Sequence, residues 1–442
     1  MIDKDSILKA YQAGRLTTAE AAEKLLALQN QTSALKPPSA SVDPNVVSEQ
    51  VDDSVIKAES AIPTTTSSIK LPLSKGQKGL WLLQKLTPEM SAYNTPFALR
   101  FRQKLDPELW HKACRKLVAH YPILQTVIQE EGGRPVQVID PTQPLWFELE
   151  DIAHLPQADL IPYLKTKAKA PFNLESGPLL RVQLFIRSEA EYILLVTIHH
   201  IIVDGTSMVH LLRTLLQIYQ ALTEESEYTL TTVEASYHDF VLWEQELLAG
   251  EAGRRQRAYW QQQLSGELPL LALPLDKPRP PIQRFKGETY STQLEPDLTR
   301  KVRDLAKSHR MNLSLVFLGI FKLLLHRYTG QADLLIGTPT AGRPQRRFEE
   351  TIGYFVNMVV LRSRLDETGS FLDYLKQLQL IVVDALDHGA YPFPQLVADL
   401  GLKPDPAISP LFQVGFAFQN FIRAKDLWVF ADQGQENVPF EL

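Results

Sequence analysis

The sequence contains a single cysteine, Cys114, and no run of apolar residues long enough to span a bilayer. One thiol excludes an internal disulfide framework and any zinc or iron–sulfur site built from several cysteines, and it is typical of a reducing compartment. The first residues, MIDKDSILKAYQ, carry charges where a secretory signal needs an apolar core. We therefore expect a cytoplasmic protein without a membrane partner.

The chain also lacks a surplus of basic over acidic residues. The chain has 46 Lys and Arg against 51 Asp and Glu, a net charge of −5, whereas a nucleic-acid footprint needs a basic surplus or a clustered basic face. The glycine-rich nucleotide loops GxGxxG and GxxxxGK[ST] are absent, which argues against a nucleotide-dependent enzyme. Apolar residues still make up 44% of the 442 residues, so the chain can bury a core without a metal or disulfide. Two or three domains, or one two-lobed unit, fit this length.

No aromatic residue occurs between Tyr11 and Trp81. Within that stretch, residues 1–30 still show helical periodicity, with a capping-box spacing from Thr17 to Glu20 before a leucine stripe. We interpret residues 1–30 as a helical docking segment for a partner protein, with a frayed chain end as the alternative. Residues 31–69 are rich in Ser, Thr, Pro, Val and Asp without a period, which predicts a flexible linker.

From residue 70 onward, segments with strand and helix patterns alternate. Strands are predicted at 97–103, 135–140, 179–187, 192–200, 333–340, 356–365 and 411–419, and the third and fourth are predicted to form a hairpin. Helices are predicted at 107–120, 207–222 and 371–388, with one or two more across 301–328, and the proline-rich segment 273–287 is predicted to be irregular. This pattern indicates an α/β or α+β class with a first lobe at 70–260 and a second at 261–442. Cys114 lies on the apolar face of its helix, so we expect a core residue rather than a nucleophile.

The densest polar cluster is HHIIVDGTS, residues 199–207, placed where an apolar strand ends and an amphipathic helix begins. Imidazole exchanges protons near neutral pH, and a strand end can hold it rigidly at a cleft. Asp204 can orient an imidazole or pair with a cation, and Gly205 permits a tight turn and close approach of the backbone to a ligand. The helix that follows offers free N–H groups to developing negative charge.

Structural roles compete with these interpretations, because a histidine at a strand end is usually a satisfied structural residue. Adjacent residues of a strand point to opposite faces, so we assign His199 to the interior and keep His200 as the candidate for chemistry. A metal site is not expected, because the two side chains cannot both chelate from one strand and no HExxH motif is present. No Ser or Cys stands in a nucleophile elbow, so a covalent triad is not expected either.

Seven segments in order now resemble the motifs of one family. They are LSKGQKGLWLL (73–83), AHYPILQTVI (119–128), IHHIIVDGTS (198–207), YHDFVLWE (237–244), IGYFVNMVVLR (352–362), HGAYPFPQLV (388–397) and DPAISPLFQVGF (405–416). In this order and spacing they resemble a condensation domain of a nonribosomal peptide synthetase, a member of the HHxxxDG acyltransferase superfamily that includes chloramphenicol acetyltransferase.

The resemblance implies two chloramphenicol-acetyltransferase-like lobes in a V, with the active site in a tunnel between them. The implied reaction is attack of a carrier-bound amine on a carrier-bound acyl thioester, with His200 as the catalytic residue, either as base or by positioning the amine. It implies that Asp204 is mainly structural and pairs with an Arg of the second lobe, for which Arg343 is the candidate. A solvated loop cation is the alternative role for Arg343. Gly205 is expected to approach the thioester, and Ser207 and Asn357 are weaker candidates for the tunnel lining.

The resemblance also implies the partners. They are an upstream donor carrier protein, a downstream acceptor carrier protein and an adjacent adenylation domain. If the upstream carrier belongs to a separate synthase, residues 1–30 are expected to dock it. No cofactor is expected to be bound by the chain itself, since substrates arrive on the phosphopantetheine arms of the carriers. A starter domain that uses acyl-CoA and a catalytically degenerate recruitment domain remain as alternatives. The family continues past its seventh motif, so the second lobe is expected to be truncated at its end.

Overall fold

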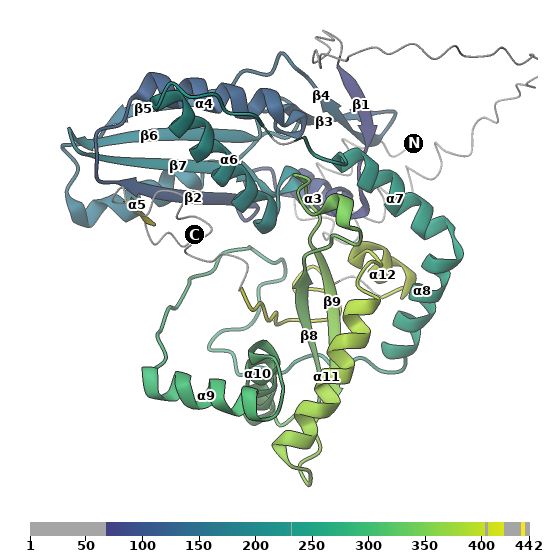
Figure 1. Ribbon diagram of the computed structural model, residues 1–442. Helices are drawn as coiled ribbons and strands as arrows, with labels where there is room; N and C mark the ends of the chain where they lie inside the picture. Colours follow the sequence, from purple (N-terminus) through teal and green to yellow (C-terminus); the bar gives the residue numbers. More distant parts are fainter. Residues whose placement is uncertain (1–67, 231, 403–404, 420–434, 438–442) are drawn as a thin grey trace, which may run out of the picture.

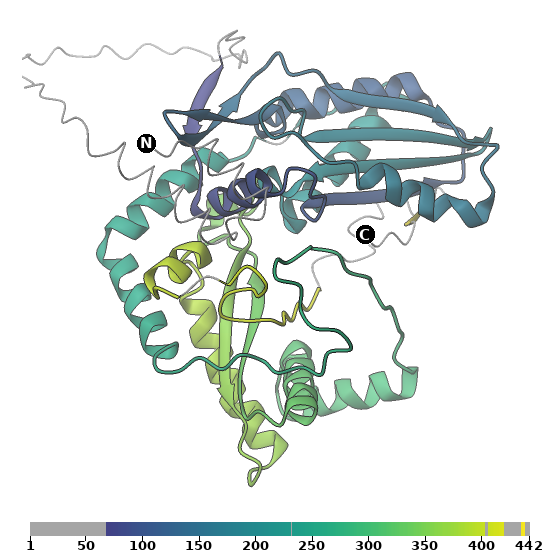
Figure 2. The same ribbon diagram turned by 180° about the vertical axis from the view of Figure 1, so that it is seen from behind.

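The computed structural model describes residues 68–230, 232–402, 405–419 and 435–437. The predicted docking segment, residues 1–30, and the linker up to residue 67 lie outside these residues. Figure 1 shows two lobes that diverge from a common side, where two helices run from one lobe to the other, and Figure 2 shows the same arrangement from behind. No single described helix is both long and apolar enough for a membrane span, and the α9–α10 pair that passes such a test jointly is bent by 110°.

The first lobe and the connecting helices alternate strands and helices as the sequence predicts. In chain order the elements are β1 (Ile69–Pro72), α3 (Lys75–Leu86), β2 (Asn94–Phe101), α4 (Pro107–His120), a 3-10 turn (Pro122–Gln125), β3 (Thr126–Glu131), β4 (Arg134–Ile139), β5 (Trp146–Asp151), α5 (Gln157–Ala168), β6 (Leu180–Ser188), β7 (Glu191–His199), a second 3-10 turn (His200–Ile202), α6 (Gly205–Thr223), α7 (Tyr237–Ala249) and α8 (Glu251–Gln263).

The main sheet of the first lobe has the order β10-β2-β7-β6-β5, and a smaller sheet has the order β1-β4-β3. Strands β6 and β7 pair antiparallel, which confirms the predicted hairpin. Helices α4 and α6 bury the larger apolar cluster against one face, and α5 covers a smaller cluster on the other. Cys114 belongs to the larger cluster and is 1% exposed, and burial raises the pKa of its thiol to about 12. It is therefore a core residue, as predicted.

The second lobe contains α9 (Pro296–Ser308), α10 (Leu313–Thr329), β8 (Asp333–Thr340), a 3-10 turn (Arg346–Phe348), β9 (Asn357–Arg364), α11 (Phe371–Asp387) and α12 (Phe393–Asp399). Strands β8 and β9 pair antiparallel, and α10 and α11 pack with them around a second apolar core. Trp260, at the end of α8, is buried in this second core. Strand β10 (Gln435–Asn437) follows the second lobe in the sequence but pairs antiparallel with β2 of the first.

One predicted strand is wrong. Residues 411–419 form no strand but a single parallel bridge, between Gly337 of β8 and Gly415. Two backbone hydrogen bonds make this bridge, from Gly337 to Val414 and from Phe416 to Gly337. The apolar alternation that suggested a strand instead serves ring packing, since Phe412 meets Phe393 and Phe416 meets Phe321.

A buried lysine, Lys322, joins α10 to both strands of the second lobe. Its ammonium is fully enclosed and donates to the carbonyls of Leu334 (3.1 Å) and Leu361 (2.9 Å) and to the hydroxyl of Ser363 (2.7 Å). Burial lowers the pKa of Lys322 to about 7, although the charge of Asp333 opposes the change. The amine therefore loses its proton far more easily in the folded protein than in the unfolded chain.

We expect Lys322 to make the protein more stable as the pH rises from about 7 towards 10, and Lys322→Met to remove this contribution. Between the folded pKa near 7 and the unfolded value of 10.5, only the unfolded state holds this proton, so raising the pH favours folding. The measurement is urea unfolding at several pH values across this range. Lys307→Met, on the exposed side of α9, is the control and should leave the slope unchanged. Equal slopes in all three proteins would contradict the expectation.

Candidate active site

The candidate histidines lie at the carboxyl end of β7, a central strand of the main sheet. The strand ends at His199, which is fully buried and accepts a hydrogen bond at Nδ1 from the Ile201 N–H (3.1 Å). Burial, with smaller effects from His200 and Arg181, lowers the pKa of His199 to about 3, so this ring stays neutral. The structure thus places His199 in the interior.

His200 begins the 3-10 turn that follows β7 and is partly exposed. Its Nδ1 lies 2.6 Å from the carbonyl oxygen of Val203. Because a carbonyl can only accept, Nδ1 carries the hydrogen in this contact, and the lone pair of the neutral ring is then on Nε2. The backbone N–H of His200 donates to the carbonyl of Tyr93 (2.8 Å), and its ring meets the ring of Tyr354 edge-to-face at 5.2 Å. The turn therefore fixes both the tautomer and the orientation of the imidazole.

Asp204 ends the turn and caps α6. Its Oδ1 accepts from the Ser207 N–H (2.8 Å), so the helix starts at Gly205, two residues before the predicted start. The carboxylate is 2% exposed and also accepts from Arg343 Nη1 (2.8 Å to Oδ2) and Nη2 (3.1 Å to Oδ1), a bidentate pair. Its Oδ2 accepts a further bond from the Phe355 N–H (3.1 Å). The expected pairing of Asp204 with Arg343 is thus present in the structure.

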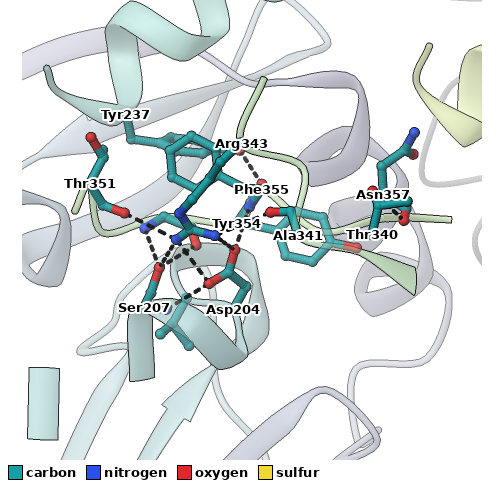
Figure 3. A network of polar contacts seen from close by, with 12 residues as sticks. Asp204, Ser207, Tyr237, Thr340, Ala341, Arg343, Thr351, Tyr354, Phe355 and Asn357 are labelled. Atoms are coloured by element: carbon teal, nitrogen blue, oxygen red, sulfur yellow. Dashed lines mark hydrogen bonds and ion pairs between the residues drawn. The ribbon is translucent and has the colours of Figure 1, made fainter. Parts of the chain in front are cut away.

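Arg343 follows β8 and reaches from the second lobe to the first (Figure 3). Its side chain is 6% exposed, so it is not a solvated loop cation. The guanidinium donates to Ser207 Oγ (2.9 Å) and to the carbonyls of Ala341 and Thr351 (both 3.2 Å), and it lies over the ring of Phe355 at 4.4 Å. This buried network is the main polar link that we find between the lobes in the described part of the chain.

Ser207 and Asn357, the weaker candidates for the tunnel lining, differ in their surroundings. Ser207 is fully buried, and its hydroxyl donates to the carbonyl of Gly353 and accepts from the Gly353 N–H (3.0 Å each) and from Arg343. Asn357 does line a cavity, but all its polar side-chain atoms are engaged. Its Nδ2 donates to the carbonyls of Gly389 and Tyr391, and its Oδ1 accepts from the Phe393 N–H. Asn357 therefore fastens the segment before α12 to β9.

Sequence reasoning missed two tyrosines at the junction. The hydroxyl of Tyr237, on α7, donates to the carbonyl of Tyr354 (2.7 Å) and lies 2.9 Å from Ser74 Oγ, whose hydroxyl can donate to it. The ring of Tyr354 fits because Gly76 has no side chain; a Cβ there would lie 2.7 Å from the ring. Both tyrosines fall inside recognised motifs, but an aromatic residue in an apolar run looks the same whether it packs in a core or against an active-site histidine.

A cavity of about 470 Å³ adjoins the candidate site, lined by Arg343, Tyr354 and Asn357 and by residues of α7 and α8. His200 does not line it. Among the described residues, no group of three or more His, Cys, Asp or Glu side chains could hold a metal ion. The arrangement therefore provides an oriented imidazole beside a helix N-terminus, with a buried ion pair behind it.

Gly342 sets the approach of Arg343 to Asp204, and we expect Gly342→Ala to reduce stability by about 3 kcal/mol. Its φ is +64°, and an added Cβ would lie 1.6 Å from the carbonyl oxygen of Phe355. Gly266→Ala is the matched control, because Gly266 also has a positive φ (+76°) but no atom within 4 Å of the added carbon. Chemical denaturation measures both variants. Equal losses would mean that backbone strain alone, rather than the crowded junction, explains the effect.

Comparisons with known proteins agree with this architecture. The family model described as "Condensation domain" matches residues 68–437. Polyketide synthase PksN of Bacillus subtilis (strain 168) is 46% identical over 81% of this chain and 6% of its own length. One of the linear gramicidin synthase subunits of Brevibacillus parabrevis is 36% identical over 84% of this chain and 5% of its own length.

The solved structures agree as well. The crystal structure of holo-AB3403, a four-domain nonribosomal peptide synthetase bound to AMP and glycine, superposes with a TM-score of 0.72 at 25% identity, over 81% of this chain and 27% of that one. The chain thus spans only a small part of the large synthases that it matches, and the match covers both lobes.

Proposed function

Because this chain belongs to the family of condensation domains, we propose that it forms an amide bond between a donor acyl group and an acceptor amine, each delivered as a thioester on a carrier protein. The observation that carries the proposal is the geometry of His200. Its Nδ1 is committed to the carbonyl of Val203, so Nε2 is the ring atom left to interact with an amine. A partly exposed imidazole of this kind, beside the junction of two lobes, suits aminolysis.

The proposed reaction uses no protein nucleophile. The acceptor amine attacks the thioester carbonyl, and the nitrogen becomes cationic as the carbon–nitrogen bond forms. His200 Nε2 accepts the surplus proton or holds the amine by a hydrogen bond, and the Val203 carbonyl stabilises the imidazolium that results. The carbon–sulfur bond then breaks, and the thiolate leaves and takes up a proton. The products are an amide on the acceptor carrier and a free phosphopantetheine thiol on the donor carrier.

Asp204, Arg343 and Gly205 are proposed as supporting residues. The Asp204–Arg343 pair fixes the start of α6 against the segment that joins β8 to β9 (residues 341–356). The first N–H groups of a helix have no partner within it, so the amide of Gly205 is suited to approach the oxygen of the thioester carbonyl. His199 supports the turn through its bond from Ile201.

The partners follow from the same proposal. Among the relatives, one is named a polyketide synthase and another belongs to a linear gramicidin synthase, so the donor is proposed to be a polyketide or peptidyl chain on an upstream carrier. A downstream carrier would present the amino acid, loaded by an adenylation domain. Residues 1–30 remain proposed as the docking segment for the upstream carrier.

The proposal is tested by incubating the purified chain with an acyl-loaded donor carrier and a panel of aminoacyl-loaded acceptor carriers. Intact-protein mass spectrometry should show the acceptor carrier heavier by the acyl group. If only acyl-CoA acts as donor, the chain is a starter domain instead. If both carriers bind the chain but neither donor transfers its acyl group, the chain is a recruitment domain and not an enzyme.

A further inference from the structure

The cavity beside the candidate site has its own chemical character. It lies between α7, α8 and the segment that joins β8 to β9 (residues 341–356). Tyr354 of this segment lines the cavity and also meets the ring of His200 at 5.2 Å. The ring of Tyr354 therefore touches both this cavity and the imidazole. Its volume of about 470 Å³ is within the usual range for small-molecule sites. The aminolysis proposed above assigns it no role.

Two buried hydrogen-bond acceptors belong to its lining. Glu244 of α7 is 5% exposed, and its sole hydrogen bond to a described residue runs from the Lys75 N–H to Oε2 (2.7 Å). Gln256 of α8 has a buried Oε1 atom without a hydrogen-bond partner among the described residues. A buried acceptor without a donor is costly, so Gln256 Oε1 favours a ligand that donates a hydrogen bond. The other carboxylate oxygen of Glu244, Oε1, accepts no hydrogen bond from a described residue and can accept from the same ligand.

The aromatic part of the lining favours a positively charged donor. Phe240 and Trp243 line the cavity from the same helix as Glu244 and stack on each other at 5.7 Å. The face of an indole or phenyl ring attracts ammonium and guanidinium groups. Carboxylate, amide oxygen and aromatic ring together form a typical environment for an organic cation.

No nearby lysine or arginine side chain of the described residues occupies the cavity beside Glu244 and Gln256. Arg343 is the only cationic side chain among the described residues that line the cavity. Its terminal nitrogens already bind Asp204, Ser207 and two carbonyls. Lys75 and Lys78 do not line the cavity, although both charges act on Glu244. Their effect is smaller than that of burial, which raises the pKa of Glu244 to about 7. A cation in the cavity would meet acceptors that no lysine occupies.

We propose that this cavity binds a small organic cation, an alkylammonium or alkylguanidinium group, between Glu244, Gln256 and the ring of Trp243. The cation can belong to a free amine or to the basic side chain of an aminoacyl substrate. Its binding does not depend on the proposed amide formation, because every group that recognises it is outside the His200 turn.

The test is isothermal titration of the full chain with agmatine, which carries both cationic groups on an aliphatic stem. We expect saturable binding that Glu244→Gln weakens about tenfold or more, as loss of a charge-assisted contact would. The amide oxygen that this substitution introduces can still accept from the Lys75 N–H, so the variant should fold. Gln256→Leu should also weaken binding, whereas Glu246→Gln, on the exposed side of α7, should not change it. Absence of saturable binding, or equal affinity in Glu244→Gln and the parent, overturns the proposal.

A second arm identifies the source of the cation. Agmatine is added to the condensation assay with acceptor carriers loaded with lysine or with norleucine. Selective inhibition of the lysyl acceptor assigns the cavity to a substrate side chain. Binding of agmatine that leaves both rates unchanged assigns it to a free amine. The titration does not involve carriers, so a failure of the proposed reaction is distinguishable from a failure of the cation site.

Discussion

Replacing His200 by alanine should lower the rate of amide formation about 100- to 10,000-fold and leave the protein folded. The imidazole is partly exposed and outside the apolar cores, so its removal leaves no large cavity. What is lost is an Nε2 atom held in one orientation by the 2.6 Å contact between Nδ1 and Val203. The measurement is the single-turnover rate of acyl transfer between loaded carriers, followed by mass spectrometry.

His154→Ala is the matched control for this result. His154 is an exposed histidine of the first lobe, far from the β7 turn in the sequence, and the same substitution there should leave the rate unchanged. A thermal unfolding midpoint close to that of the parent would show that His200→Ala is folded. Amide formation at the parental rate in folded His200→Ala would refute the assignment of this residue.

Asp204→Ala should cost about 3–5 kcal/mol of unfolding free energy, the largest stability effect that we expect. The substitution leaves the buried guanidinium of Arg343 without its carboxylate and also removes the side-chain cap of α6. The Phe355 N–H loses an acceptor as well. Equilibrium urea unfolding measures the loss, and Arg343→Ala should give a loss of similar size. The double variant should lose much less than the sum of the two single losses, because each single change already breaks the pair.

Arg255→Ala provides the comparison for an exposed pair. Arg255 contacts Glu251 on α8 at 2.8 Å, with 68% and 72% of the two side chains exposed. Such surface pairs contribute about 0–1 kcal/mol. A loss of this small size in Asp204→Ala would mean that the pair between the lobes is not the structural link proposed here. Arg343→Lys should not restore the parent stability, since an ammonium cannot make the bidentate contact.

Local signals account for what could be predicted from the sequence. Helix α4 begins and ends at the predicted residues, because Asp106 caps it and Pro107 occupies its first turn. The strand at 333–340 matches β8 for a similar reason, since it is a short apolar run with turn residues on both sides. The segment 411–419 has an equally good apolar pattern, yet a strand also needs a partner, and here Gly337 supplies only one bridge.

The candidate site combines local and distant contributions. The burial of His199 and the exposure of His200 follow from their alternation at the end of a strand, which is a local property. The contact between Asp204 and Arg343 spans 139 residues, and no periodicity points to it. The expectation of this pair came from the resemblance to the condensation domains, and Arg343 lies outside the seven motifs that carry it. The position of Tyr354 depends on the missing side chain of Gly76, a distant relation that no single motif reveals.

The pairing of β10 with β2 has a consequence for synthesis of the chain on the ribosome. Strand β2 (Asn94–Phe101) is made before its partner, because residues 435–437, which cover its outer edge, follow about 330 residues later. At roughly 5–20 residues per second, that edge waits roughly 20–70 seconds for its partner. An uncovered edge strand can pair with another chain, so the nascent first lobe is exposed to association with its neighbours on a polysome until residues 435–437 emerge.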